Sequence, residues 1–329
     1  MISEQDYSSF HVLLTGGTGF FGRALLRNWI SQELSGEKIS CVCVLTRNPQ
    51  IFLNKYPEFA DHSWLHFHQG DILNPVSLPD VELFSHVLHA ATDSTFGPKL
   101  TPLERYIQIV DGTRNMLEYA VSKQIPRFLL TSSGGVYGPQ PASMESIPED
   151  YNGMPDPLKP EHAYSVAKRN AEHLCALYRD KFGLQTVVAR CFAFVGRDLP
   201  LDAHFAIGNF IRDALNGDEI VVSGDGSAVR TYLDQRDLAR WLTKMLINGI
   251  DGEAYNVGSD VPITIKDLAN LVRDILAPHK SVRIAKQSSA NKLHNRYIPS
   301  ILKANSQLQL QVQFGLKEAV QDTVTNFEY

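Results

Sequence analysis

The sequence predicts an α/β fold, in which a doubly wound parallel sheet is followed by a smaller mixed α/β domain. Strand-like and helix-like stretches alternate through the first 195 residues. Several strand-like stretches are almost entirely apolar, as strands are when helices cover both faces of a parallel sheet. After Gly196 the predicted elements become shorter and more mixed. We therefore expect a sheet domain over residues 1–195 and a second domain over 196–329, some of whose segments return to the first.

The individual elements follow from short apolar runs and from helical spacing of apolar residues. Strands are predicted at 12–14, 39–45, 64–68, 87–91, 127–132, 186–194 and 219–223. Helices are predicted at 20–34, 103–122, 164–181, 205–215, 237–247, 264–276 and 316–327. Thr264 and Asp267 stand where an acidic variant of a capping box would begin a helix. The segment 139–160 contains six prolines, so we expect it to be a loop, at the mouth of a site.

The composition excludes several classes of partner. Lys and Arg number 31 and Asp and Glu 36, so the net charge is −5 and nucleic acid is not expected to bind. No apolar run approaches the roughly 18 residues of a membrane helix, and the N-terminus lacks the features of a signal peptide. The four cysteines have neither the spacing nor the nearby histidines of a metal site. The chain is therefore expected to be cytoplasmic, with no membrane partner and no metal.

A glycine-rich segment joins the first predicted strand to the first predicted helix. It reads Thr-Gly-Gly-Thr-Gly-Phe-Phe-Gly over residues 15–22, which places Gly16, Gly19 and Gly22 three residues apart. One glycine allows a tight turn, the next lets the backbone approach a pyrophosphate, and the third lets helix and strand pack closely. The free N–H groups and partial positive charge of the helix N-terminus also favour an anion. The segment therefore predicts a dinucleotide site in a Rossmann-like domain.

A tyrosine and a lysine four residues apart form a second motif. On a helix this spacing puts Tyr164 and Lys168 on one face. A free tyrosine has a pKa of roughly 10 and is a poor base at neutral pH, whereas an adjacent ammonium favours its phenolate. Taken alone, such a pair is more often an exposed helix face. It gains weight from Thr131-Ser132-Ser133, which ends the preceding strand, because strand ends carry the site in a parallel sheet.

Together these motifs resemble the extended short-chain dehydrogenase/reductases, specifically the nucleotide-sugar epimerase/dehydratase group. The resemblance covers nearly the whole chain and includes further segments: Gly70-Asp71, His89-Ala90-Ala91, Val136-Tyr137-Gly138, Arg190, Gly224-Asp225-Gly226 with Arg230, and Tyr255-Asn256-Val257-Gly258. It implies an NAD(P)-dependent enzyme that acts on a sugar nucleotide in a cleft between two domains. It also implies a homodimer, formed through the helices at 103–122 and 164–181.

The resemblance implies roles for single residues. Ser133 would hydrogen-bond the reacting sugar hydroxyl, Tyr164 would move its proton, and Lys168 would hold the nicotinamide ribose and lower the tyrosine pKa. Asp71 would accept a hydrogen bond from adenine, and Arg230 would bind the diphosphate of the substrate. The residues implied in cofactor binding are Gly16, Gly19, Phe20, Phe21, Gly22, Arg47, Asp71, Ile72, Ala90, Ala91, Tyr164 and Lys168. Those implied in substrate binding are Ser133, Asn209, Arg230 and Arg296.

Departures from the family pattern bear on the reaction. The 4,6-dehydratases usually carry an acidic residue or an Asp-Glu pair where this chain has Gly134 and Gly135, and the decarboxylases usually carry a glutamate at the second position. Since a glycine cannot transfer a proton, we expect an epimerase that oxidises and re-reduces one sugar carbon, C4. Ala193, where sugar epimerases often have an asparagine, leaves the sugar contacts open.

Three other functions stay open. The main alternative is an NADPH-dependent keto-sugar reductase. A 4,6-dehydratase that uses Glu145 or Glu149 of the proline-rich loop, and a cofactor sensor without turnover, are less favoured.

The end of the second strand bears on the choice of cofactor. Thr46 is neutral, whereas an acidic residue at this place would favour NAD. Arg47 could pair with a 2′-phosphate, which favours NADP over NAD. It could instead stack on adenine, which either cofactor would allow.

Overall fold

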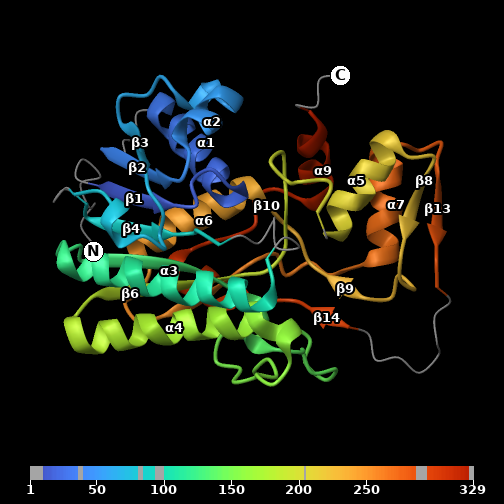
Figure 1. Ribbon diagram of the computed structural model, residues 1–329. Coiled ribbons are helices and arrows are strands. Elements are labelled where there is room, and N and C mark those ends of the chain that lie inside the picture. The colour runs from blue at the N-terminus through green and yellow to red at the C-terminus, as the bar shows by residue number, and fades with distance from the viewer. Residues whose placement is uncertain are drawn as a thin grey trace.

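The computed structural model describes residues 10–35, 40–80, 84–92, 100–203, 205–286 and 295–325. Seven parallel strands form the central sheet in the order β11-β6-β5-β4-β1-β2-β3 (Figure 1). Their bounds are β1 (His11–Thr15), β2 (Cys41–Thr46), β3 (Leu65–Gln69), β4 (His86–His89), β5 (Arg127–Ser133), β6 (Gln185–Cys191) and β11 (Ala254–Val257). The chain winds from β1 first to β2 and β3 and then, on the other side, to β4, β5 and β6. The predicted doubly wound α/β fold is therefore confirmed.

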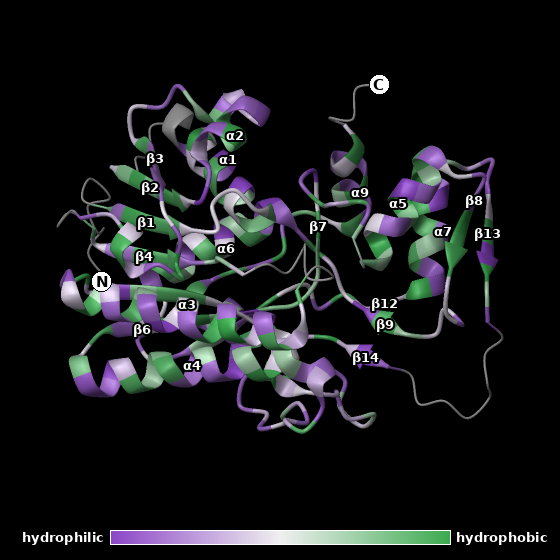
Figure 2. Ribbon diagram, viewed as in Figure 1, coloured by the Kyte–Doolittle hydropathy of each residue, from purple (hydrophilic) through white to green (hydrophobic). Residues whose placement is uncertain are grey.

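Helices cover both faces of this sheet. α1 (Phe20–Ser35) and α6 (Gln235–Asn248) lie on one face, and α3 (Pro102–Ser122) and α4 (Ala163–Phe182) lie on the other (Figure 1). Alternate residues of β1 divide between the two faces, since Val12 and Leu14 pack with α1 and α6 while Leu13 packs with α3 and α4. α3 and α4 alternate hydrophobic and hydrophilic residues along their length, as helices on a sheet surface do (Figure 2).

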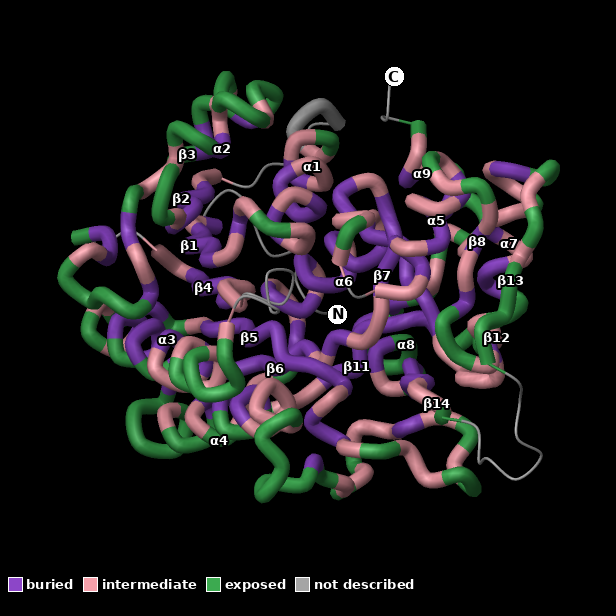
Figure 3. Tube along the Cα trace, turned by 45° about the vertical axis from the view of Figure 1, so that its right-hand side comes forward, coloured by how far each residue is buried: buried purple, intermediate pink, exposed green. Residues whose placement is uncertain are grey.

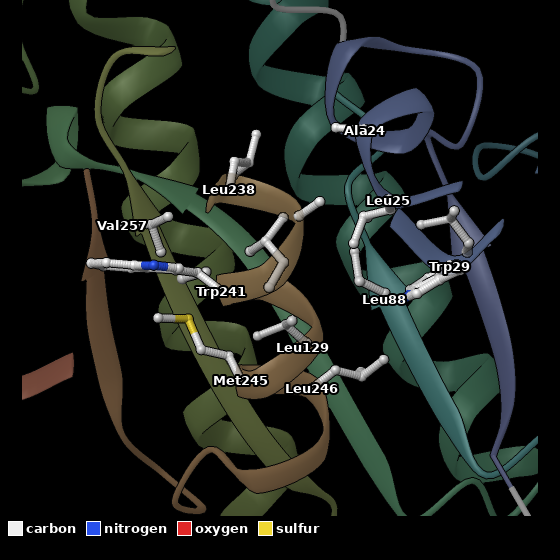
Figure 4. Packing of buried hydrophobic residues seen from close by; sticks show 14 of the residues in the cluster. Ala24, Leu25, Trp29, Leu88, Leu129, Leu238, Trp241, Met245, Leu246 and Val257 are labelled. Atoms are coloured by element: carbon white, nitrogen blue, oxygen red, sulfur yellow. The ribbon is translucent and has the colours of Figure 1, made fainter. Parts of the chain in front are cut away.

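Two large tryptophan side chains pack in the core between the sheet and the helices α1 and α6. Trp29 of α1 and Trp241 of α6 are both buried, and they lie on either side of Leu88 and Leu129 of the sheet (Figure 4). The indole N–H of Trp29 donates a hydrogen bond to Thr243 Oγ1 at 2.9 Å, so its polar atom is satisfied inside the core. Except for the edge strand β3, the sheet strands are buried over most of their length, and exposed residues gather on outer helix turns and loops (Figure 3).

A smaller group of elements follows the sheet. α5 (Ala206–Asn216), α7 (Ile265–Leu276) and α9 (Leu316–Val324) share a core with the paired strands β8 (Glu219–Val222) and β13 (Ser281–Ile284). A short sheet of β12 (Ile263–Thr264), β9 (Val229–Arg230) and β14 (Arg296–Tyr297) lies beside them. Thr264 Oγ1 accepts a hydrogen bond from the Asp267 N–H at 3.0 Å, so the predicted N-cap of α7 is confirmed.

The predicted and observed elements differ mainly after residue 185. The strand predicted at 186–194 divides into β6 and β7 (Phe194–Val195), because β7 leaves the central sheet to pair with β10 (Leu233–Asp234). α6 and β11 come after Gly196 but complete the layers of the central sheet. The sequence did not indicate α2 (Pro49–Lys55), β11 or α8 (Leu302–Leu308). Residue 39 and residues 326–327, which were included in predicted elements, lie outside the described residues. Among the helices described, none has the length and apolar character needed to cross a membrane.

Candidate active site

A cavity of about 710 Å³ lies along the carboxyl ends of the central strands, where they face the smaller group of elements. Most residues predicted for the site line it together: Gly16, Gly19, Phe20, Phe21, Arg47, Asp71, Ile72, Ala90, Ala91, Ser133, Tyr164, Lys168 and Arg230. Three predicted residues do not line it: Gly22, Asn209 and Arg296. The strand ends therefore converge on one site, as in other open parallel sheets.

The glycine loop forms the part of this cavity at the N-terminus of α1. Gly16 has a φ of +74°, and a Cβ built on it would lie 2.5 Å from the carbonyl oxygen of Ala90. Both the backbone conformation and the close approach require glycine there. The Gly19 N–H donates to the Gly16 carbonyl at 3.1 Å, which closes the turn before α1 begins. Gly16 and Gly19, which have no side chains of their own, thus border the cavity with their backbone.

Ser133, Tyr164 and Lys168 line the same cavity, from the end of β5 and the first turns of α4. Ser133 ends β5, and its Oγ accepts a hydrogen bond from the Gly135 N–H at 3.1 Å. Tyr164 and Lys168 lie in the first two turns of α4, four residues apart and on one face. The Lys168 ammonium is buried, and it donates to Thr92 Oγ1 and to the Thr131 carbonyl, both at 2.7 Å.

Burial controls the ionisation of the tyrosine and the lysine. It raises the pKa of Tyr164 to about 12, although a hydrogen bond with the Ser133 side chain acts in the opposite direction. It lowers the pKa of Lys168 to about 8, because a buried ammonium loses its hydration. The Tyr164 pKa therefore shifts upward, opposite to the direction expected from a neighbouring lysine. The Lys168 ammonium donates its hydrogen bonds to Thr92 Oγ1 and the Thr131 carbonyl.

The remaining wall of the cavity is mainly apolar, with Arg230 as its cation. The Arg230 guanidinium donates to the carbonyls of Val229 at 2.9 Å and Asn295 at 2.8 Å, and burial lowers its pKa. The other two predicted substrate residues have partners elsewhere. Asn209 Oδ1 accepts a hydrogen bond from Arg212, and Arg296 donates to the carbonyl of Glu145 at 3.2 Å.

Comparison with known proteins assigns the family. The sequence profile of the NAD dependent epimerase/dehydratase family matches residues 12–258. The chain belongs to this family. UDP-glucuronic acid decarboxylase 1 of Arabidopsis thaliana is 28% identical over 326 residues, which cover 96% of this chain and 69% of that protein.

Two solved structures of low sequence identity have the same fold. UDP-glucose 4-epimerase of Thermotoga maritima matches with a TM-score of 0.79 and 23% identity, over 97% of this chain and 98% of that one. A dTDP-glucose 4,6-dehydratase of Streptomyces venezuelae matches with a TM-score of 0.80 and 23% identity, over 96% of each chain. The predicted family and its enzymatic nature are thus confirmed, and the fold alone does not select one reaction.

The residues of this epimerase/dehydratase family member fit a dinucleotide cofactor. The glycine loop presents bare backbone at a helix N-terminus, which suits a pyrophosphate. Asp71 lies at the end of β3, where its Oδ1 accepts the Leu73 N–H at 2.9 Å. Arg47 is exposed at the end of β2 and lines the same side of the cavity.

Several lining residues were missed by the sequence reasoning. Tyr232 and Tyr297 bring two phenols to the cavity, with Tyr297 paired to Arg230 across two short strands, and Thr92 accepts a hydrogen bond from the ammonium of Lys168. Thr92 directly follows the predicted Ala90-Ala91 pair, so its place on the strand end could have been inferred. Tyr297 lies in a strand of only two residues, which leaves no periodicity to read.

Proposed function

We propose that this chain is an NAD(P)-dependent nucleotide-sugar epimerase that inverts C4 of the sugar. The observation that carries the proposal is that Ser133, Tyr164 and Lys168 line one cavity. The two residues that follow Ser133 in the chain, Gly134 and Gly135, offer no ionisable group. The names of the similar proteins, which refer to UDP-glucose, UDP-glucuronic acid and dTDP-glucose, support a sugar nucleotide as the substrate.

The cofactor would supply the exchange of a hydride with the sugar carbon. Backbone N–H groups of the glycine loop would hold its pyrophosphate, and Asp71 would hold its adenine. Lys168 has three N–H donors, two of which go to Thr92 and Thr131 among the described residues, so the third would serve the nicotinamide ribose. The solved structure of the Streptomyces dehydratase is described as containing bound NAD, which supports NAD as a cofactor here.

The side chains of the protein itself would transfer one proton and hold the sugar in place. In its phenolate form Tyr164 would accept the proton of the C4 hydroxyl as that carbon is oxidised, and it would give the same proton back when the keto sugar is reduced on its other face. Because burial raises its pKa to about 12, the positive charge of the bound oxidised cofactor would have to favour this phenolate. Ser133 donates a hydrogen bond to the sugar oxygen in both directions. The cycle is balanced, because the hydride and the proton removed in the first half return in the second. Arg230 would hold the diphosphate while the sugar turns.

The glycines after Ser133 argue against the reactions of two relatives. Decarboxylases of the group usually carry a glutamate at the position of Gly135, and dehydratases usually carry acidic residues at both. Neither Glu145 nor Glu149 of the proline-rich loop lines the cavity. The Glu149 carboxylate instead accepts a hydrogen bond from the Asn256 N–H at 2.9 Å, beneath the sheet edge formed by β11. Epimerisation is the reaction of the group that needs only the three residues present.

A keto-sugar reductase is the second candidate function, and Arg47 is the observation that favours it. A guanidinium at the end of β2 suits the 2′-phosphate of NADPH, a cofactor that a one-way reductase consumes. The two functions differ in how the cofactor is used, because an epimerase regenerates it in every turnover.

The test is to incubate the purified protein with UDP- and dTDP-hexoses, with cofactor at a small fraction of the sugar concentration. An epimerase should convert many equivalents of sugar to the C4 epimer, detected by NMR, without net change in the cofactor. With a 4-keto sugar nucleotide supplied in place of the hexose, one NADPH consumed for each product formed would instead establish the reductase. Mass spectrometry of ligands released from the protein would name the cofactor and the nucleotide together.

We also infer a homodimer formed through α3 and α4. These helices pack side by side (Figure 1) and expose apolar residues on the outside: Leu103, Ile107, Leu177 and Phe182. Exposed apolar side chains on adjacent helices are typical of a protein interface. Light scattering should give twice the mass of one chain, and Leu177→Glu with Phe182→Glu should reduce it to that of a single chain.

A further inference from the structure

Glu172 is a largely buried carboxylate of α4 that the proposed cycle does not use. It follows Tyr164 and Lys168 at intervals of four residues, so all three side chains lie on one stripe of the helix. Only 13% of the Glu172 side chain is exposed, and Glu172 does not line the cavity. A charge that is removed from water needs partners, so the contacts of Glu172 indicate its role.

The carboxylate of Glu172 binds two neighbouring strands of the central sheet. Ser132 of β5 and Arg190 of β6 are paired in the register of these strands. The Ser132 hydroxyl donates to Glu172 Oε1 at 2.5 Å, and the Arg190 guanidinium donates to Oε2 at 2.8 Å. Hydrogen bonds to a charged group are stronger than those between neutral groups. Glu172 therefore fixes α4 to both strands at one level of the sheet.

These bonds lie directly beside the residues of the proposed catalytic site. Ser132 precedes Ser133 in the chain, and Lys168 donates to the carbonyl of Thr131 at 2.7 Å. Two consecutive residues of β5 are thus bonded to α4, the first to Lys168 and the second to Glu172 one helical turn later.

The first turn of α4, which carries Tyr164, lacks the usual local stabilisation. Its N-cap, His162, makes no side-chain capping bond among the residues described, and the turn contains no acidic residue. Helix ends without such partners for their free N–H groups are less stable. The place of Tyr164 therefore depends on the bonds that α4 makes further along, at Lys168 and Glu172.

Arg190 connects Glu172 to the turn after Ser133 as well. Its Nη1 donates to Tyr137 Oη at 2.9 Å. Tyr137 is the last residue of the short helix η5 (Gly134–Tyr137), whose N-cap is Ser133. The ion pair of Glu172 and Arg190 therefore joins α4 to the chain on both sides of Ser133.

We propose that Glu172 is a positioning residue that sets the place of Tyr164 relative to Ser133, because it binds α4 to Ser132 and Arg190. The inference rests on the proposed function, in which Tyr164 and Ser133 act on one sugar hydroxyl. Groups that act on one atom must keep their distance and direction, and a displacement of about 1 Å can lower a rate about 10²-fold. Glu172 acts through the two strands and has no contact of its own with the cavity.

The first test compares kcat with KM in the epimerase assay. Glu172→Gln keeps the size of the side chain and removes its charge, whereas Ser132→Ala removes one hydroxyl and leaves the ion pair intact. Each should lower kcat by about 10-fold or more and change the KM of the sugar nucleotide by less than about twofold, because Arg230 lies on another element. Arg179→Gln is the control, since Arg179 lies on the same helix and forms an exposed ion pair with Asp251, and it should leave kcat unchanged. An unchanged kcat in either variant, or a rise in KM as large as the fall in kcat, would overturn the proposal.

The second test is amide hydrogen exchange in the protein saturated with NAD. The N–H groups of residues 167–170 bond to the carbonyls of the first turn of α4. Glu172→Gln should speed their exchange by about 5-fold, because the turn opens more often. Residues 178–182 at the other end of the helix should exchange at the wild-type rate, which separates a local effect from a general loss of stability. Equal rates at 167–170 in wild type and variant, or faster exchange in both segments, would contradict the role of Glu172.

The exchange experiment needs neither a sugar nucleotide nor turnover, so the two proposals can fail separately. If the wild-type protein has no epimerase activity, the proposed function fails, and the exchange rates still decide whether Glu172 holds the turn of Tyr164. Unchanged exchange in an active enzyme would remove the positioning role and leave the proposed function standing.

Discussion

The imidazole of His89 lies against the hydroxyl of Thr15, with Nδ1 2.8 Å from Oγ1, and the contact joins the ends of β1 and β4. The same Thr15 oxygen accepts the Ala91 N–H at 3.1 Å, and His89 Nε2 lies 3.3 Å from Thr113 Oγ1. These hydrogen bonds hold the ends of β1 and β4 together next to Gly16, whose backbone borders the cavity. Burial, aided by the charge of Lys168, lowers the pKa of His89 to about 3.

The first prediction is that His89 makes the fold sensitive to acid. Between its ordinary pKa of 6.5 and about 3, the unfolded chain binds a proton that the folded chain does not. The stabilisation is therefore complete above pH 6.5 and decreases as the pH falls, by up to about 1.4 kcal/mol of unfolding free energy per pH unit. His89→Gln should flatten this dependence in urea unfolding experiments, with His66→Gln on the exposed side of β3 as the control. Equal slopes in wild type and His89→Gln would contradict the prediction.

The second prediction concerns Tyr164→Phe. The ring remains in place and only the hydroxyl that bonds with Ser133 is lost, so cofactor affinity should stay nearly normal. Turnover should fall by about 10²-fold or more, which is the usual scale of general acid–base catalysis. Tyr178→Phe is the matched control, because Tyr178 lies on the same helix and bonds with Glu118 away from the cavity. Rates near wild type with a confirmed substrate would exclude Tyr164 as the proton acceptor.

The cofactor side of the site could be predicted from the sequence more completely than the sugar side. Gly16, Asp71 and Ala90 each follow a strand that is recognisable from its own apolar residues, so local patterns were sufficient. The places of Tyr297 and Arg230 depend instead on pairing between strands of two residues each. Such pairing leaves no periodic signal and is decided by tertiary contacts.

The direction of the Tyr164 pKa shift could not be predicted for a related reason. The spacing of Tyr164 and Lys168 shows that both lie on one helix face, but it does not show how deeply that face is buried. Nor does it show that the ammonium of Lys168 has partners in Thr92 and Thr131. Desolvation depends on the packed structure, and here it outweighs the attraction expected from the sequence.

The third prediction concerns Arg230→Ala. The guanidinium is oriented by the carbonyls of Val229 and Asn295 while it lines the cavity, so its remaining N–H groups are available to a diphosphate. The substitution should weaken sugar-nucleotide binding by roughly 1.5–3 kcal/mol, the value of a charge-assisted hydrogen bond, and leave cofactor affinity alone. Arg283→Ala is the control, since Arg283 is exposed on β13 and pairs with Glu219. Unchanged affinity for the sugar nucleotide in calorimetry would refute the role of Arg230.

The fourth prediction is that Arg47 selects NADP. The wild-type protein should bind NADP more tightly than NAD, and Arg47→Ala should remove most of the difference, because the 2′-phosphate loses its cation. Thr46→Asp is a second variant with the opposite chemistry, since a carboxylate repels the phosphate and accepts the ribose hydroxyl of NAD. It should shift the preference toward NAD. Equal dissociation constants for the two cofactors in the wild type would count against Arg47.

The last prediction is that this chain does not form a 4-keto-6-deoxy sugar. Loss of water across C5 and C6 needs a base for the C5 proton and an acid for the departing C6 hydroxyl, both within hydrogen-bond reach. Gly134 and Gly135 offer neither, and Glu149 is held by the Asn256 N–H away from the cavity. NMR of nucleoside diphosphate hexoses incubated with the protein should therefore show the C4 epimer without the dehydrated product. If a 4-keto-6-deoxy sugar formed at catalytic rates and Glu149→Gln abolished it, the loop would have to move its carboxylate into the site, and the argument from the glycines would be wrong.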